Sequence, residues 1–362
     1  MAKEFSPNMY SAGLQPLASP TGRILDDKWL DRFEHDFGPV ARGLGRLIRP
    51  TIIAKPGRTL IWGDYSAIEA RVLPWLADSP GAEKVLDIFR TNDADPSLPD
   101  IYKIEAGHIF EKDPAEIAKG PERQTGKVAV LSLGFGGSDG ALLNMATNYG
   151  IYLGENLRKH IIETWRANNR WAVHFWGKHT ANESYGLWGA FNQALENPDT
   201  IIPVGKVAYV YDRSYLGGTV LCALPDGRRL TYPDVRVRDY VIKNDDGSEE
   251  TKRGLTYRKS YGFSGLWYGK LAENITQATA ASLLRKLLVR LVAFAETREY
   301  RDWLEVIGHT HDEGVLHVAE ELVEEGRELL HKEMMRELPW TAGLPLAVEI
   351  TDNWYYSKAV GD

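Results

Sequence analysis

The first half of the chain changes from a short strand pattern to a long helical one. Thr59 to Asp64 is a brief apolar run followed by a polar turn, which is typical of a buried strand. Ala67 to Leu76 predicts a helix, and the apolar spacing stays mostly helical to about Arg170. Asp113-Pro114 is a start signal for a further helix through Ala115 to Ala118.

The second half returns to strands and then combines them with helices. Val204 to Val241 predicts short strands, with a hairpin turn at Leu224 to Gly227 that carries an Asp-Gly pair. Gly269 to Glu296 then predicts a long helix. Trp303 to His309 and Gly314 to Val318 predict two strands joined by a tight turn at Thr310 to Glu313, and Glu320 to Glu337 predicts a last helix. Strands on both sides of a helical block predict one sheet domain that a helical insertion splits in sequence.

Composition narrows the class of protein. The 362 residues are 43% apolar and 26% charged, an ordinary globular mixture that is long enough for two or three folding units. We find no run of about eighteen apolar residues and no apolar stretch near the N-terminus, so we expect neither a membrane span nor a signal peptide. The single cysteine, Cys222, excludes an internal disulfide and favours a reducing compartment, so the expected location is the cytoplasm.

Net charge does not decide the kind of partner. A formal charge of −7 is unusual for a protein that binds nucleic acid, but phosphate binding depends on local cations rather than on the sum. Basic residues cluster at three places, and acidic residues gather at two. The basic clusters are Arg42, Arg46 and Arg49, then Arg228 and Arg229, then Arg285, Lys286 and Arg290; the acidic runs are Asp245 to Glu250 and Glu320 to Glu328. Taken alone, such runs are more often solvated surfaces than binding sites.

Two acidic residues stand at the ends of predicted strands. Asp64 begins the segment DYSAIEAR after the first strand, and Asp312 lies in the turn His311-Asp312-Glu313 of the late hairpin. Each has a simpler interpretation alone, as a helix cap and as a turn former. If the hairpin pairs beside the first strand, the two carboxylates meet at one sheet edge and repel unless a divalent cation lies between them. Oxygen ligands favour magnesium or manganese over zinc.

A third segment combines cations and apolar residues at one spacing. Arg123, Lys127, Leu131 and Phe135 are four residues apart, so on a helix they form one slanting stripe. Two cations followed by two apolar groups suit a triphosphate and then a base. The glycines that follow would loosen or end the helix where a base must approach. The simpler alternative is a solvated helix face that turns into a core face.

In this order, DYSAIEAR, RQTGKVAVLSLGFG and HDE resemble motifs A, B and C of the family A (Pol I-like) DNA polymerases. ALPDGRRLTYP, YGKLAENITQATA and GLPLAVE resemble the bacteriophage-type branch, and the resemblance covers about residues 40–357. It implies a template-directed DNA polymerase of phage-type replication that adds deoxynucleotides to a primer 3′-OH by two-metal phosphoryl transfer. The implied cofactors are two Mg²⁺ ions, for which Mn²⁺ can substitute, and the implied partners are primer-template DNA and dNTPs.

The resemblance also implies roles for particular residues. Asp64 and Asp312 would bind the metals together with the backbone carbonyl of Tyr65. Glu313 would be an auxiliary carboxylate, and Lys127 would be the catalytic cation. Arg123 and Lys127 would hold the incoming triphosphate, and Leu131 and Phe135 would line the nucleotide and template-base side. Glu69 would be the steric gate beneath the sugar, and Tyr102 would face the phosphates. The implied primer and template contacts are Arg71, which would support Glu69 or the primer end, Gln277 and His311.

The implied fold is α+β: a polymerase palm with a small antiparallel sheet, interrupted by mostly helical fingers, in a right-hand-like architecture that lacks a full thumb. The expected segments are 1–78 with the first part of the palm, 79–215 with the fingers, and 216–362 with the hairpin region and the rest of the palm. Only 63 residues precede Asp64, too few for a proofreading exonuclease and for the thumb that clasps the duplex. Three interpretations stay open: a truncated chain, a minimal polymerase, or a split polymerase in which a second polypeptide supplies thumb and exonuclease. Thr21-Gly22-Arg23 resembles the TGR element of the family without its usual continuation, and Leu131 and Phe135 replace an aromatic residue and a Tyr.

Three other interpretations stay open. A single-subunit RNA polymerase shares the palm, but Glu69 would crowd the 2′-hydroxyl of a ribonucleotide. A non-catalytic partner with this fold would be expected to have lost a motif acid or Lys127, which are present. A zinc hydrolase could use His309, His311 and Asp312, but no HExxH motif or cysteine pair supports it.

Overall fold

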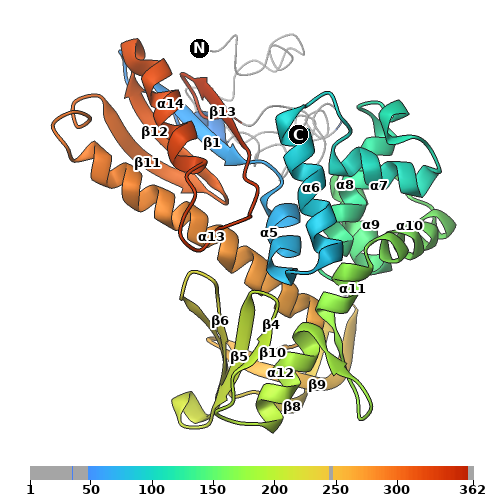
Figure 1. The fold of residues 1–362 in the computed structure, drawn as a ribbon. Coiled ribbons are helices and arrows are strands. Elements are labelled where there is room, and N and C mark those ends of the chain that lie inside the picture. The colour runs from blue at the N-terminus through green and yellow to red at the C-terminus, as the bar shows by residue number, and fades with distance from the viewer. Residues whose placement is uncertain (1–34, 36–47, 244–247, 358–362) are drawn as a thin grey trace, which may run out of the picture. The chain divides into compact units, whose positions relative to one another are not determined.

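The computed structural model describes residue 35, residues 48–243 and residues 248–357 (Figure 1). The chain forms two compact units, one made of residues 1–64, 288–333 and 350–362 and the other of residues 65–287 and 334–349. The predicted segments 1–78, 79–215 and 216–362 follow the expected palm and fingers rather than these two compact units. The division into palm and fingers stays a prediction. The TGR-like element with Arg23 lies outside the described residues.

The first unit is built on the sheet in the order β11-β12-β1-β13. The strands are β1 Arg58–Tyr65, β11 Leu304–Thr310, β12 Glu313–Ala319 and β13 Val348–Asn353. Both β1 and β11 pair antiparallel with β12, which confirms the predicted first strand, the late hairpin and their pairing. The fourth strand, β13, is an addition that the hydrophobic pattern did not predict.

The first unit has a small aromatic and aliphatic core cluster on its sheet. Leu60, Trp62, Val315 and Tyr356 form a buried cluster, in which the rings of Trp62 and Tyr356 meet edge to face at 5.3 Å. The helix α14 Val323–Met334 follows the 3₁₀ turn η4 Glu320–Leu322. The predicted last helix therefore exists, but it ends three residues earlier than the pattern suggested. Another 3₁₀ turn, η1 Arg49–Thr51, precedes β1.

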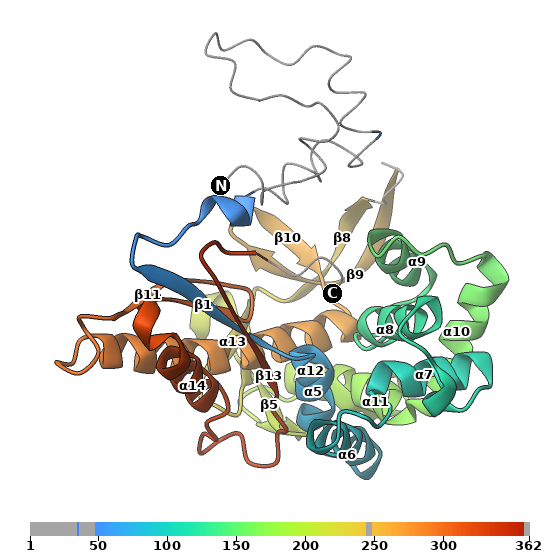
Figure 2. The same ribbon diagram turned by 90° about the horizontal axis from the view of Figure 1, so that it is seen from above.

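The second unit begins with a run of helices (Figure 2). They are α5 Ile68–Ala77, α6 Pro80–Ala94, α7 Ile101–Phe110, α8 Pro121–Leu133, α9 Asp139–Asn148, α10 Glu155–Asn168 and α11 Arg170–Trp176. A Cβ at position 126 would lie 2.1 Å from the backbone oxygen of Tyr102, so Gly126 allows α7 and α8 to pack closely. The helix predicted after Asp113 is wrong in length: only the 3₁₀ turn η2 Pro114–Glu116 forms, because Ile117 is already extended, with φ −71° and ψ 111°.

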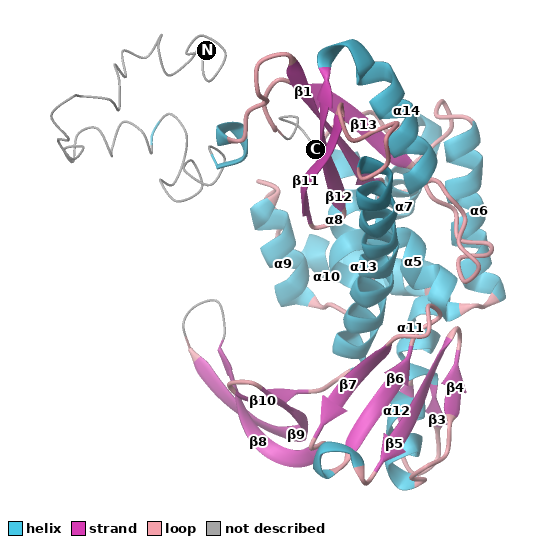
Figure 3. Cartoon of the chain, turned by 90° about the vertical axis from the view of Figure 1, so that its left-hand side faces the viewer, coloured by secondary structure: helices cyan, strands magenta, loops and turns pink. Residues whose placement is uncertain are grey.

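The rest of the second unit is mostly β-structure (Figure 3). It contains β2 Lys178–His179, β3 Ser184–Tyr185, α12 Gly186–Glu196, β4 Ile202–Val204, β5 Val207–Asp212, η3 Tyr215–Gly217, β6 Thr219–Ala223, β7 Arg229–Pro233, β8 Arg236–Lys243, β9 Glu249–Lys259 and β10 Gly262–Gly265. The strands β4 to β7 form one antiparallel sheet in chain order, and β8 to β10 form another. Phe191 of α12 packs edge-on against Tyr209 and Tyr232, at 5.5 Å each, and so joins the helix to the first of these sheets.

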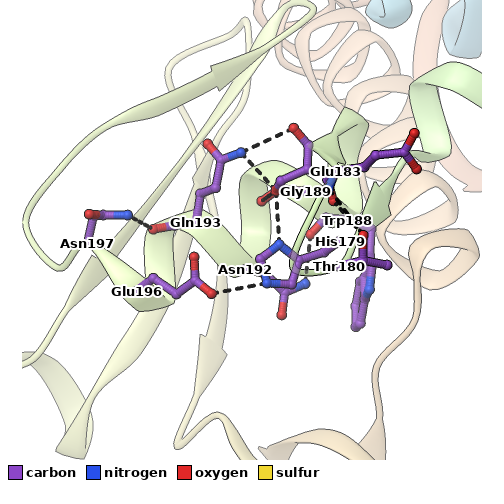
Figure 4. Close-up of polar contacts among 10 residues, drawn as sticks. His179, Thr180, Glu183, Trp188, Gly189, Asn192, Gln193, Glu196 and Asn197 are labelled. Atoms are coloured by element: carbon purple, nitrogen blue, oxygen red, sulfur yellow. Dashed lines mark hydrogen bonds and ion pairs between the residues drawn. The ribbon is translucent and has the colours of Figure 1, made fainter.

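A polar network fixes the β2–β3 hairpin against α12 (Figure 4). The ring nitrogens of His179 contact Ser184 Oγ at 2.9 Å and Glu196 Oε1 at 3.1 Å. Gln193 Nε2 donates to Ser184 Oγ at 2.8 Å. Because two side chains engage the Ser184 hydroxyl, we interpret the cluster as a structural clasp rather than a nucleophile.

The predicted turn at Leu224 to Gly227 is confirmed and is attached to a long helix. The helix is α13 Tyr268–Ala295. Arg228 Nε and Ser282 Oγ both donate to Asp226 Oδ2 at 2.7 Å, and Arg228 also donates to Ser282 and to the backbone oxygen of Ala278. Burial alone would raise the pKa of Asp226, but the hydrogen bonds from Ser282 and Arg228 outweigh it and lower that pKa. Asp226 therefore stays ionised and holds the turn on α13.

Within the described ranges, no helix combines the length and the apolar content that a membrane crossing requires.

Candidate active site

The two predicted metal-binding acids lie at the same end of neighbouring strands. Gly63 of β1 is opposite Gly314 of β12, so Asp64 follows that pair directly and Asp312 lies two residues before Gly314. Thr310 is opposite Glu313, which leaves only His311 and Asp312 in the turn. His311 adopts a left-handed conformation with φ 53°, which lets the chain reverse in two residues. The predicted pairing of the strands is confirmed and places Asp64 and Asp312 at the same end of neighbouring strands, whereas their role as metal ligands stays a prediction.

This donor set fits a hard divalent cation. Asp64 and Asp312 are both half-buried at the strand ends. Across the described part of the chain, no group of three or more His, Cys, Asp or Glu side chains could hold a metal ion. Mg²⁺ typically uses one or two protein carboxylates and takes its other ligands from water and substrate phosphates, whereas zinc sites need three or four protein ligands. The residues present therefore fit magnesium, and the zinc interpretation based on His309 loses its support.

Glu313 lies differently from its neighbour Asp312. Only 1% of Glu313 is exposed. Arg49 Nη1 donates to both carboxylate oxygens, at 3.0 and 3.1 Å, and the Tyr356 hydroxyl donates to Oε2. The guanidinium of Arg49 also lies 4.9 Å from the ring centroid of Tyr356. Glu313 is thus the centre of a buried clamp directly beside the turn that carries Asp312.

The clamp depends on segments far apart in sequence. An antiparallel bridge between Ile53 and Tyr355 joins the segment after η1 to the segment after β13 and brings Arg49 and Tyr356 to the same carboxylate. Burial, reinforced by the hydrogen bond to Glu313, raises the pKa of Tyr356 to about 12. The phenol therefore stays protonated near neutral pH and continues to donate to Glu313.

On α8 the two predicted cations share one aromatic neighbour. The guanidinium of Arg123 lies 5.2 Å from the ring centroid of Tyr102, and Lys127 Nζ lies 5.9 Å from it and 5.5 Å from the ring of Tyr149. Arg123 Nε also donates to Asp100 Oδ2 at 2.8 Å. Burial raises the pKa of Tyr102 to about 12, so its hydroxyl is neutral at physiological pH. The predicted stripe is confirmed for these two residues.

Three further candidates line one small cavity. Glu69 of α5, Leu131 of α8 and Phe135 border a cavity of about 40 Å³ in the second unit. Its other lining residues are Ala70, Leu73, Pro74, Val85, Ile101, Glu105, Val130, Gly134, Trp165, Asn169 and Trp171. One detail of the stripe is wrong: α8 ends at Leu133, with Gly134 as its C-cap, so Phe135 lies beyond the helix. A positive φ of 74° at Gly136 then turns the chain.

Gln277 and Glu69 meet although 208 residues separate them. Gln277 Nε2 on α13 donates to Glu69 Oε1 in the first turn of α5. The sequence analysis gave these residues separate roles, at the primer-template and at the sugar. The contact indicates that Gln277 also fixes the position of the Glu69 carboxylate.

Arg71 has a structural environment that the resemblance did not predict. It is 3% exposed, and its guanidinium donates to both carboxylate oxygens of Asp93, at 2.6 and 2.7 Å. Its Nε donates to the backbone oxygen of Ser66 at 2.8 Å, and Phe89 lies 4.3 Å beneath it. These contacts join α5 to α6. They give no support to the expectation that Arg71 supports Glu69 or the primer end, which stays a prediction.

Several residues of the site escaped the sequence analysis. Asp100, which orients Arg123, could have been identified as a helix cap, since its side chain also accepts from the Lys103 amide at 2.9 Å. Tyr356 gave no local signal and Arg49 only that of a basic cluster, because their contacts with Glu313 span 43 and 264 residues.

Two curated proteins match most of the chain in sequence. No protein-family model matches the chain. The DNA polymerase of Bacillus phage SP02 is 33% identical over 330 residues, which are 89% of this chain and 45% of that protein. DNA polymerase I of Caldicellulosiruptor bescii is 23% identical over 323 residues, or 88% of this chain and 29% of that protein. The chain thus spans less than half the length of both curated relatives.

A solved structure supports the fold independently. The POL domain of Pol1 from M. smegmatis, in complex with DNA primer-template and dNTP, is 18% identical and superposes with a TM-score of 0.54. The match covers 88% of this chain and 43% of that one. The expected α+β architecture of helices and antiparallel sheets is confirmed. Over most of its length the chain is therefore similar in sequence to a phage DNA polymerase and to a DNA polymerase I, and it corresponds to part of their length.

Proposed function

We propose that the chain is a DNA-directed DNA polymerase that adds deoxynucleotides to a primer 3′-OH in phage-type DNA replication. The observation that carries this proposal is the position of Asp64 and Asp312 at the same end of β1 and β12 in a relative of DNA polymerases. The M. smegmatis complex supports primer-template DNA and dNTPs as partners. The second polypeptide with thumb and exonuclease, and the cytoplasmic location, remain predictions from the sequence.

In this proposal Asp64 and Asp312, with the backbone carbonyl of Tyr65, hold two Mg²⁺ ions. When bound, the ions lower the pKa of the primer hydroxyl and neutralise the leaving pyrophosphate. Glu313 acts on the site by position: its clamp with Arg49 and Tyr356 holds the first residue of β12 and so fixes the turn beside it. His311, exposed in the same turn, would contact the primer or template.

The second unit supplies the groups for the nucleotide. Lys127 contributes a point charge to the triphosphate, and Arg123 contributes the donors that Asp100 leaves available, since a guanidinium has five. Tyr102 supports both cations from below. Leu131 and Phe135 would border the base and sugar, and Glu69, held by Gln277, would stand beneath C2′.

A primer-extension assay tests the proposed function. A labelled primer-template is incubated with dNTPs or NTPs, in Mg²⁺, in Mn²⁺ and in EDTA. We expect extension with dNTPs that requires a divalent ion. Preferential use of NTPs would favour the RNA polymerase interpretation, and absence of extension with either substrate in either metal would favour a non-catalytic partner.

We expect Glu69→Ala to raise ribonucleotide use relative to deoxyribonucleotide use. Removing the carboxylate opens space for a 2′-hydroxyl, and relief of a clash worth ~1.4 kcal/mol changes the ratio of kcat/KM values for NTP and dNTP about tenfold. Single-nucleotide insertion kinetics measure that ratio. The matched variant is Glu69→Gln, which keeps the bulk and should keep the selectivity. If the alanine variant has the parental ratio, Glu69 is not the sugar gate.

A further inference from the structure

The sheet of β8, β9 and β10 has a face that the proposed function leaves without a role (Figure 3). Directly opposite residues of antiparallel strands share a face, and here Tyr240 is opposite Lys252 and Arg258 is opposite Phe263. The alternation of side chains along the strands adds further members. We define the basic face by the residues Arg236, Arg238, Tyr240, Lys252, Arg258 and Phe263.

Contacts across the strands confirm that these side chains gather on one side. The guanidinium of Arg238 lies 3.9 Å from the ring centroid of Phe263, although the two residues come from different outer strands. A Cβ at Gly265 would lie 2.3 Å from the ring of Tyr240, so that ring lies against β10. Cations and aromatic rings are therefore interleaved on a continuous surface.

The basic face is accessible and carries a surplus of positive charge. The Arg236 side chain is 66% exposed, and Phe263 is 46% exposed. Two carboxylates oppose its four cations: Asp234 pairs with Arg236 and Arg238, at 2.6 and 2.9 Å, and Glu250 pairs with Lys252 at 3.2 Å. Arg258 is exposed as well. The local balance is positive on a chain whose formal charge is −7.

The opposite face of the same sheet has a different character. Tyr257 packs edge-on against Tyr232 of β7, with ring centroids 5.3 Å apart, so this face joins the neighbouring sheet. Arg253 on this side pairs with Asp239 at 3.1 Å. The basic face is therefore the side directed away from the β7 contact, where a ligand can bind.

We propose that the basic face binds the unpaired template strand of the DNA. Arginine and lysine side chains bind backbone phosphates, and unpaired bases offer their ring faces to exposed aromatic side chains. A duplex would present its phosphates but keep its bases stacked, so the aromatic component favours a single strand. The identity of this strand as template rests on the proposed polymerase function, whereas the binding of single-stranded DNA does not.

Fluorescence anisotropy with labelled (dT)₂₀ and with a blunt hairpin duplex tests the proposal. We expect the intact protein to bind (dT)₂₀ more tightly than the duplex. The double variant Arg236→Gln/Arg258→Gln should bind (dT)₂₀ more weakly, and the slope of log K against log salt should fall by about 1.4, or about 0.7 for each lost phosphate contact. Phe263→Leu should weaken binding about fivefold or more, since a stacking platform is lost.

A matched double variant on the opposite face, Arg253→Gln/Lys259→Gln, removes the same charge and should bind (dT)₂₀ like the parent. Equal losses in both double variants would overturn the proposal, as would tighter binding of the duplex. Thermal unfolding checks that each variant is folded. In the Arg236→Gln/Arg258→Gln variant, extension of a primer with a one-nucleotide template overhang should be unchanged. This assay tests the polymerase proposal, whereas the anisotropy assay tests the binding of single-stranded DNA, so either proposal can fail without the other.

Discussion

Asp64→Asn and Asp312→Asn should each reduce primer extension by roughly a thousandfold and leave the protein folded. A metal ion contributes several kcal/mol to a phosphoryl-transfer transition state, and a loss of about 4 kcal/mol corresponds to about three powers of ten in rate. Asparagine keeps the size of aspartate but removes the charge that holds the ion. Single-turnover extension with saturating dNTP measures the loss.

Two further readouts separate a metal role from a structural one. Mn²⁺ binding, followed by electron paramagnetic resonance, should weaken in both variants without any substrate present. Thermal stability should be unchanged or slightly higher, because removing one of two neighbouring like charges relieves repulsion. The matched control is Asp302→Asn, whose side chain is 84% exposed before β11 and should be neutral in every assay. Extension by either site variant at more than a few per cent of the parental rate would refute the assignment.

The common position of Asp64 and Asp312 at one end of the sheet was predictable from local patterns and one assumed strand pairing. β1 is a short apolar run, and the late hairpin has two apolar strands around a two-residue turn. Both runs are apolar almost throughout, so both strands are expected to be buried, and if the hairpin pairs beside the first strand, the acids at the strand ends lie at one edge of the sheet. The confirmed pairing of β1 with β12 supports that chain of inference.

Glu313 shows where such reasoning stops. Its sequence context, one residue after Asp312, indicates another carboxylate of the site, but its partners come from Arg49 and Tyr356. Long-range ion pairs leave no mark in local periodicity, and burying a carboxylate is tolerable only because these partners compensate the loss of water. The same holds for Arg71, whose partner Asp93 lies on the next helix.

Backbone conformation explains the miss at Phe135. A spacing of four residues predicts one stripe only while the helix continues. Here α8 ends at Leu133, yet the turn still carries Phe135 to the cavity that Leu131 lines. The contact was therefore anticipated for the wrong reason. The sheet of β8 to β10 was missed beyond Val241, because its polar and apolar residues follow no simple one-face burial.

The largest effect expected in the second unit is that of Lys127→Met. Charge grows on the triphosphate during transfer, and a preorganised cation stabilises it most in the transition state. Loss of one such group typically costs about a hundred- to a thousandfold in the chemical step. The apparent affinity for dNTP should fall less, since Arg123 on the same stripe still binds the ground state. Rapid-quench kinetics at varied dNTP separate the two effects.

The alternative is that Lys127 serves only to pack against aromatic rings. Its Nζ lies 5.9 Å from the Tyr102 ring and 5.5 Å from the Tyr149 ring, contacts worth about 0.5–1 kcal/mol each at exposed sites. On that view Lys127→Met would lower the melting temperature and leave single-turnover chemistry near normal. If Lys127 instead stabilises the transition state, Lys127→Met should change the melting temperature little and lower the rate of the chemical step strongly. Lys127→Arg should then recover part of that rate, because it keeps the positive charge in a side chain of different shape. Lys159→Met on the exposed side of α10 is the charge-matched control, and it should alter neither the rate nor the dNTP dependence.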